Sequence, residues 1–426
     1  MSTTMLVAMC ALFALAVPIA VSIGLAAIVG IQFFDAMPPI VIGQQLYVTL
    51  DRFPLVAIPF FILAGNLMDA GGISRRLVEF ARAIVGGLQG GLPAACVLTC
   101  MIFAAVSGSS STATTFAVGA VLIPAMVRAG YPVAWAAALQ ACASELGVII
   151  PPSIPMILYG VAADVSVGEL FIAGFGPGFL IGAALIAYVL WVSRRKGWGK
   201  RDGDGRQTLG AATLSAFWAL LMPVVVLGGI YGGLVTPTEA SALAVFYAVF
   251  VGALIHRELR WAGLSDAVRR SVISSCVVLF IIAWAGLLGF IINREGVTAD
   301  IGRWIIETLD NKWLFLIAVN LVLFVIGMFI ETSAAIIILA PILAPVAAKF
   351  GLDPVHFGIV MVVNLAVGFI TPPFGVNLFA ACMVARIPVQ KIIPPIIPFI
   401  GVVLACLMLI TFIPAIPLTL RDLVYR

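Results

Sequence analysis

The stretches Gly147-Val-Ile-Ile-Pro-Pro-Ser153 and Gly368-Phe-Ile-Thr-Pro-Pro-Phe374 decide the fold of this chain. The glycines that open them lie 221 residues apart, and a Leu-x-Pro pair and a basic-x-Gly pair precede each stretch with the same offset. A Pro-Pro pair removes two backbone donors and forces the residue before it into an extended conformation. We therefore predict two related halves, each with a helix that is interrupted in its middle.

The composition places these interrupted helices in a membrane. Hydrophobic residues make up 63% of the 426 residues and charged residues 10%, whereas soluble proteins are only about half apolar. Long continuous apolar runs exclude an outer-membrane barrel, and the modest net charge of +4 indicates no nucleic-acid partner. No basic residue precedes Arg52, so the first apolar run is expected to be retained as a helix rather than cleaved as a signal peptide. We predict an all-α polytopic membrane protein with ordinary spans near residues 4–33, 54–70, 169–192, 212–234, 239–256, 271–293 and 392–415.

A basic linker at residues 193–211 divides the chain into a first half, 1–192, and a second half, 212–426. Its excess of Arg and Lys places it in the cytoplasm. An odd number of crossings separates equivalent points, so the two repeats are predicted to have inverted topology, which is typical of secondary transporters. An old duplication kept only for packing is the alternative. Each repeat is predicted to contain a hairpin and then a broken helix, at about 92–128 and 132–163 in the first and at about 313–349 and 354–385 in the second.

A small polar tip lies in the middle of each predicted hairpin, at residues 106–115 and 327–335. The flanking segments of about 15 residues are shorter than the ~20 residues that cross the hydrocarbon core, so re-entrant hairpins are expected. The tip hydroxyls could meet a cation, and the free N–H groups of the following half-helix could meet an anion. The alternative is that these small residues serve helix packing. The hydroxyls belong to Ser109, Ser110, Ser111, Thr112, Thr332 and Ser333.

The two Pro-Pro breaks leave backbone carbonyls free, and such oxygens suit a hard cation such as sodium. A simple kinked helix is the alternative. Glu145 stands two residues before the first break, and Glu331 lies at the second tip, aligned with Ser110. A charged side chain at the bilayer centre costs at least about 2.5 kcal/mol. Both carboxylates are therefore expected to join a cation site, to relay a proton or to pair with a neighbouring donor.

Three further features have structural interpretations. The run Thr236-Pro-Thr-Glu239 is typical of a capping box that starts the helix after it. The seven cysteines lie in apolar stretches without metal-ligand spacing and are expected to pack. His256 and His356 stand at predicted loop edges, which argues against an intramembrane Ser/His protease, the rival functional class.

Four stretches together carry a resemblance to a known family: Ser107-Gly-Ser-Ser-Ser-Thr-Ala, Gly147 to Ser153, Gly228-Gly-Ile-Tyr-Gly-Gly-Leu-Val-Thr-Pro-Thr-Glu-Ala240 and Gly368-Phe-Ile-Thr-Pro-Pro-Phe-Gly-Val-Asn377. They are similar to the large membrane subunit (DctM type) of tripartite ATP-independent periplasmic (TRAP) transporters. The resemblance implies a sodium-coupled importer of small organic acids (dicarboxylates, keto acids or sugar acids) in the bacterial inner membrane, working by an elevator motion. It also implies two partners, a small membrane subunit (DctQ type), expected here as a separate chain, and a periplasmic substrate-binding protein (DctP type).

The resemblance also implies positions for the ligands, with two or more sodium ions as the coupling ions. The first sodium site would use Ser107, Gly108, Ser109 and Ser110 with the backbone from Gly147 through Ile150 to Pro151, and Glu145 nearby. The second would use Glu331, Thr332 and Ser333 with Gly368 and Thr371. The organic acid is expected at Ser111, Thr112, Ser153, Thr332, Ser333 and Asn377. The binding protein is expected to dock on outward loops near 163–169 and 294–312. A stand-alone sodium- or proton-coupled dicarboxylate carrier and, more weakly, an ion channel are the alternatives.

Overall fold

The computed structural model describes residues 2–15, 17–34, 37–85, 87–107, 111–199, 208–309 and 311–425. This part of the chain is helical throughout and contains no β-strand. Eight of its helices are long and apolar enough to cross a membrane, and up to nine spans result if a bent pair counts as one. The prediction of an all-α multi-span membrane protein is confirmed.

The N-terminal apolar run is not one span, as expected, but two helices. Helix α1 (Ser2–Ala14) ends before Pro18, and α2 (Ile19–Phe34) packs back against it. Pro18 lacks a backbone N–H and restricts the residue before it, which explains the break. Helix α3 (Ile40–Leu50), which the sequence analysis missed, lies with α2 against α14 (Trp261–Arg294).

The rest of the first half consists of helices that follow one another through short connections. The amphipathic helix α5 was not predicted. Its residues Arg75 and Arg76 pair with Glu258 at 3.0 and 2.8 Å, and the hydrogen bond from Arg76 lowers the pKa of that carboxyl. The sequence places both segments on the same side of the membrane, which agrees with this contact. The elements are η1 (Phe53–Val56), α4 (Ala57–Ala70), α5 (Ile73–Val85), α6 (Gly91–Ser107), α7 (Ser111–Arg128), α8 (Val133–Ser144), α9 (Leu146–Ile149), α10 (Ile154–Ala163) and α11 (Val167–Lys196).

The second half begins beyond the linker. The capping box at its start is confirmed, because the Thr236 side chain accepts from the backbone N–H of Glu239 while the Glu239 carboxylate accepts from the backbone N–H of Thr236. The expected outward loop at 294–312 contains an amphipathic helix, α15. The elements are α12 (Leu209–Tyr231), α13 (Pro237–Phe250), η2 (Val251–Ile255), α14, α15 (Val297–Thr308), α16 (Lys312–Gly327), α17 (Thr332–Lys349), α18 (Pro354–Phe369), α19 (Val376–Ala385), α20 (Val389–Phe412) and α21 (Ala415–Tyr425).

The two predicted repeats fold into corresponding helices. Helices α6, α7 and α8 contact one another, as do α16, α17 and α18. A break follows α8 and its short extension α9, where the axis bends by 43° before α10, and a second break separates α18 from α19. Both Pro-Pro bonds are cis. Helices α7 and α17 have 18 residues each, longer than the half-length segments expected there.

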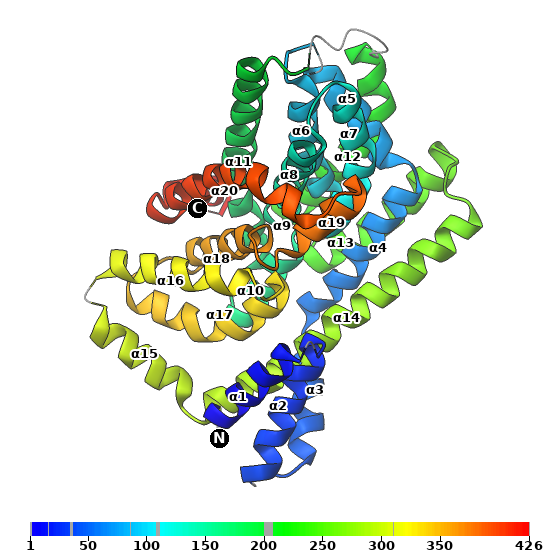
Figure 1. Cartoon of the computed structure of the whole chain (residues 1–426). Coiled ribbons are helices and arrows are strands. Elements are labelled where there is room, and N and C mark those ends of the chain that lie inside the picture. Colours follow the sequence, from blue (N-terminus) through cyan, green and yellow to red (C-terminus); the bar gives the residue numbers. More distant parts are fainter. Residues whose placement is uncertain are drawn as a thin grey trace.

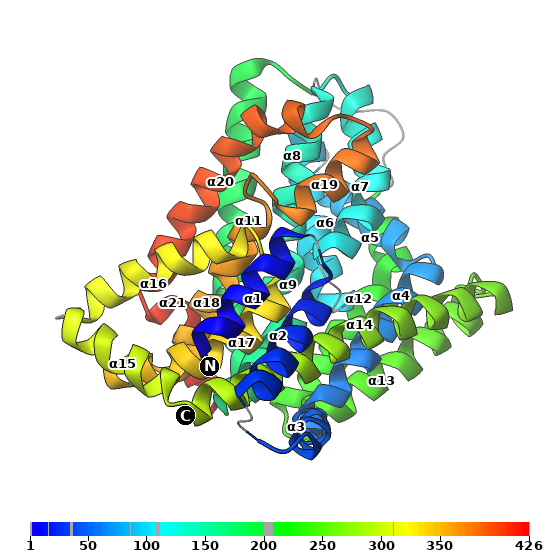
Figure 2. The ribbon, with the colours of Figure 1, turned by 60° about the horizontal axis from the view of Figure 1, so that its bottom comes forward.

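Helices α8 and α18 form the centre of the molecule. Every residue of α8 from Trp135 and of α18 from Val355 is buried. Helices α4, α13 and α14 lie together along one flank, and α15 to α18 gather toward the opposite one (Figures 1 and 2). The helices that lead into the two breaks are therefore enclosed by protein, as interrupted helices in a membrane require.

Candidate functional site

The first break is held open by side-chain caps. Ile150 is extended and Ser153 is the N-cap of α10. The Ser153 hydroxyl accepts from the backbone N–H of Met156 at 3.4 Å and donates to the carbonyl of Val148 at 2.5 Å. Since the Pro-Pro pair cannot donate there, this single hydroxyl joins the two half-helices. Ser153 is buried and serves the break itself.

A buried polar cluster connects this break to the second repeat through Asn377. Its amide nitrogen lies 2.8 Å from a carboxylate oxygen of Glu145, 2.7 Å from the Ser144 hydroxyl and 2.9 Å from the Ala141 carbonyl. Its amide oxygen accepts from the Thr115 hydroxyl at 2.7 Å, which also lies 2.6 Å from the Ser144 hydroxyl. Helix α19 of the second half is thereby bonded to α7 and α8 of the first.

Glu145 keeps one oxygen for another partner. Ser111 also hydrogen-bonds its carboxylate, but the buried oxygen Oε2 has no partner among the described residues. An unsatisfied buried carboxylate oxygen is costly and asks for an explanation such as an ion. The surrounding hydroxyl, amide and carbonyl oxygens are of the type that sodium accepts.

The second break has a different chemistry, in which Glu331 is the N-cap of α17. Its carboxylate accepts from the backbone N–H groups of Ser333 and Ala334 at 2.9 and 3.1 Å and from the Ser333 hydroxyl at 2.9 Å. The ends of α16 and α18 meet beside it, where a Cβ on Gly368 would lie 2.5 Å from the carbonyl carbon of Gly327. Only glycine allows the two backbones to approach so closely.

A cavity of about 150 Å³ lies between the two repeats and the flank formed by α4 and α14. Helices from both halves line it, and its polar residues come from α4, α14 and α17. Of the predicted site residues, Glu331 and Ser333 line it, whereas Asn66 and Ser274 were not foreseen. Their signal is weak, since each is a lone polar residue in an apolar span. The lining residues are Ile62, Asn66, Ala113, Val148, Ile154, Pro155, Ser274, Val278, Glu331 and Ser333.

Comparison with known proteins fixes the family. A family model described as the DctM component of tripartite ATP-independent periplasmic transporters matches residues 6–416. The chain belongs to the DctM family. The resemblance found in the sequence is thus confirmed, and because the relatives are transporter permease subunits rather than enzymes, the protease alternative is excluded.

Several relatives of this DctM chain carry printed functions. It is 46% identical over 403 residues to the isethionate TRAP transporter permease DctMQ of Oleidesulfovibrio alaskensis, covering 94% of this chain but 63% of that protein. It is 42% identical to the C4-dicarboxylate permease DctM of Pseudomonas aeruginosa, with 94% of both chains covered. It is 36% identical to the 2,3-diketo-L-gulonate permease YiaN of Escherichia coli, covering 92% and 91%. The crystal structure of the Alcanivorax borkumensis YdaH transporter shares the fold, with a TM-score of 0.64, 16% identity and coverage of 92% and 90%.

The remaining predicted site residues of the DctM chain fall into three groups. Gly108, Ser109 and Ser110 lie outside the described residues, and Ser107 ends α6 next to them. Asn377 lies in the Glu145 cluster and is fully buried, as is Ser111, away from the 150 Å³ cavity. The others lie at the tips and breaks without lining that cavity: Thr112 is half-buried, and Gly147, Ile150, Pro151, Thr332, Gly368 and Thr371 are buried.

A charged cluster at the other end of α18 escaped the sequence analysis. Arg421 of α21 lies 2.8 Å from Asp353 and 3.8 Å from Glu169, so the C-terminal helix joins α18 to α11. Partial burial alone would raise the pKa of Asp353, but the hydrogen bonds from Arg421 and from the start of α18 hold it below its ordinary value. His356, expected at a loop edge, is instead buried in the first turn of α18, with its Nε2 3.0 Å from the carbonyl of Ile410.

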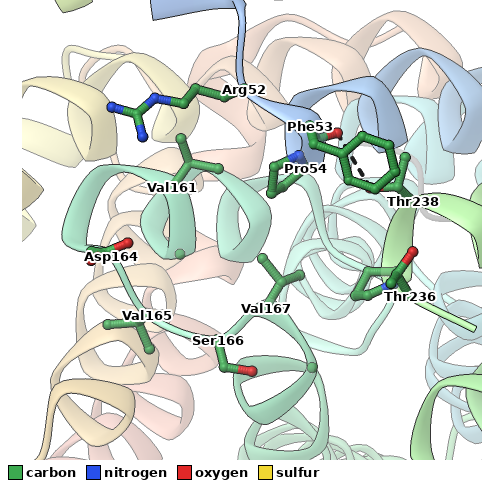
Figure 3. A pocket seen from close by; sticks show the side chains of 13 residues that line it. Arg52, Phe53, Pro54, Val161, Asp164, Val165, Ser166, Val167, Thr236 and Thr238 are labelled. Carbon is green, nitrogen blue, oxygen red and sulfur yellow. Dashed lines mark hydrogen bonds between the residues drawn. The ribbon is translucent and has the colours of Figure 1, made fainter. Parts of the chain in front are cut away.

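A larger cavity of about 430 Å³ lies apart from the breaks, around the connection between α10 and α11. Figure 3 shows Arg52 and Asp164 toward one end of it and Thr236 and Thr238 toward the other. No predicted sodium or substrate residue lines it. Because a base and an acid both line it, this cavity offers no net charge to select an organic anion, but it opens next to the predicted docking loop at 163–169.

Proposed function

We propose that this chain is the translocating subunit of a sodium-coupled TRAP importer of small organic acids in the bacterial inner membrane. The observation that carries the proposal is the 150 Å³ cavity between the two interrupted repeats. Transporters with inverted repeats bind substrate at such a place, where helix ends and unwound backbone meet near the bilayer midplane. The cavity is smaller than the ~300–1,000 Å³ of drug-sized ligand sites, which suits a small acid.

Sodium coupling is supported by the oxygen chemistry of the two clusters. At the first, the free oxygen of Glu145 and the hydroxyls of Ser111, Thr115 and Ser144 would hold the ion. At the second, Glu331, Ser333 and the backbone near Thr371 would do so. A bound sodium ion would supply positive charge beside an anionic substrate, which no basic residue lining the described part of the cavity supplies.

The motion we propose is an elevator. The pairs α6–α7 and α16–α17 would act as re-entrant hairpins that cover the substrate from opposite sides, and the inverted repeat gives each side one cover. The cavity walls fit this division, because α4 and α14 contribute one polar side of the cavity and the repeats contribute the rest. Movement of the repeats along α4 and α14 would then carry the cavity across the bilayer.

Two partner proteins complete the proposed system. A small membrane subunit of the DctQ type would cover an apolar flank, and a substrate-binding protein of the DctP type would deliver the acid. The docking surface would comprise the loop at 163–169 beside the 430 Å³ cavity and helix α15, whose Trp304 is 65% exposed. Charge complementarity in such a contact speeds association and weakens with salt.

Reconstitution of the chain in liposomes tests this function. With the small subunit, an acid-loaded binding protein and an inward sodium gradient, we expect accumulation of the labelled acid. Replacing external sodium by potassium at constant pH should abolish it, and unchanged uptake would contradict sodium coupling. If the chain alone transports free acid as fast as the complete system, it is a stand-alone carrier.

A further inference from the structure

Glu331 occupies an anion-binding position with the chain's own carboxylate. The first N–H groups of a helix have no partner within the helix and attract negative charge. At the start of α17, the N–H groups of Ser333 and Ala334 both donate to Glu331, and the Ser333 hydroxyl donates to its other oxygen. The aligned residue of the first repeat is Ser110, which carries no charge.

The cavity beside this cap has an unusual charge for an acid-binding site. Among the described residues that line it, Glu331 alone is ionisable, and it is acidic. The other polar groups are neutral. They are the Asn66 amide, which lies 2.8 Å from the Ser271 hydroxyl, and the hydroxyls of Ser274 and Ser333. These groups can hydrogen-bond one acidic group but cannot neutralise a second.

We propose that this cavity selects small acids with a single negative charge and rejects dianions such as dicarboxylates. The inference rests on the proposed function, since it assigns the substrate class of the same site. A monoanion can direct its charge toward the neutral donors and its uncharged end toward Glu331. A second carboxylate would have to face the Glu331 carboxylate. Two like charges ~6 Å apart at an effective dielectric constant of ~20 weaken binding roughly a hundredfold.

The test compares two acids of equal carbon skeleton, 3-hydroxypropionate and malonate, which differ by one charge. Their binding to the purified complex of this chain and its small subunit is measured by calorimetry at pH 8, at fixed sodium concentration and ionic strength. Omitting the binding protein removes its own selectivity. We expect the wild type to bind 3-hydroxypropionate at least tenfold more tightly than malonate.

The Glu331→Gln variant should shrink this ratio at least tenfold, because the amide oxygen can still cap α17 while the charge is gone. Should that variant fold poorly, Glu331→Ser serves the same purpose, since serine is a favoured N-cap. The matched control is Asp266→Asn, an exposed carboxylate earlier on α14, which should leave the ratio unchanged.

Three results would overturn the inference. Equal or tighter malonate binding by the wild type, with sodium-driven uptake intact, defeats the charge selection and leaves the importer standing. A ratio that is the same in Glu331→Gln, Glu331→Ser and the wild type assigns the selectivity to other residues. Absence of binding by both acids, together with failed uptake by the complete system, defeats the proposed function and this inference with it.

Discussion

Removal of the Asn377 amide tests the bond between the two halves of the chain. Asn377→Ala leaves the Glu145 carboxylate without its 2.8 Å donor and the Thr115 hydroxyl without its 2.7 Å acceptor. A hydrogen bond to a charged group contributes about 1.5–3 kcal/mol and a neutral one about 1 kcal/mol. Since Thr115 and Ser144 can still bond each other, we expect a net loss of about 3–4 kcal/mol. At roughly 1–2 °C per kcal/mol for a chain of this length, the Tm falls by about 5 °C.

Thermal unfolding of the purified protein in detergent, followed by intrinsic fluorescence, measures this shift. The control Asn293→Ala removes the same group at an exposed position near the end of α14 and should change the Tm by less than about 1 °C. A double-mutant cycle with Thr115→Val should show non-additivity, since the two side chains are in contact. Equal melting of Asn377→Ala and Asn293→Ala, or strict additivity in the cycle, would refute the reasoning.

Three further outcomes are expected. Gly368→Ala should fold poorly, because its Cβ would lie 2.5 Å from a backbone carbon that cannot move aside, whereas Gly289→Ala, with open space around it, should give normal yield and Tm; equal yields would contradict the close approach. Asp353→Asn should lower the Tm at neutral pH by the equivalent of about 1–3 kcal/mol, since it breaks the bond to Arg421. Because the native pKa of Asp353 lies below its ordinary 3.8, its contribution is complete above about pH 4 and is lost as the pH falls through the lowered value, so the Tm gap between variant and wild type should close in acid, and a gap independent of pH would count against the ion pair. Ser333→Leu should abolish sodium-dependent uptake while the protein stays monodisperse in detergent, and retained uptake would place the second ion and substrate elsewhere.

Local rules in the sequence determined much of the architecture. The Pro-Pro pairs predicted interruptions after α8 and α18, because the missing donors act on their own neighbours wherever the chain lies. The capping box at Thr236 was predictable for the same reason. Apolar run length located most of the spans, although Pro18 divided the first one and the amphipathic helices α5 and α21, which have too few apolar residues to stand out, were missed.

The tertiary structure alone decided which polar residues meet. Asn377 and Glu145 lie 232 positions apart, and no periodicity or spacing predicts such a contact. Asn66 and Ser274 reach the cavity only because α4 and α14 pack beside the repeats. Glu331 was visible in the sequence as a costly charge. Its role as a cap that places one negative charge in an otherwise neutral cavity depends on where α17 begins and which helices surround it, because the electrostatics of a buried group are set by its neighbours in space.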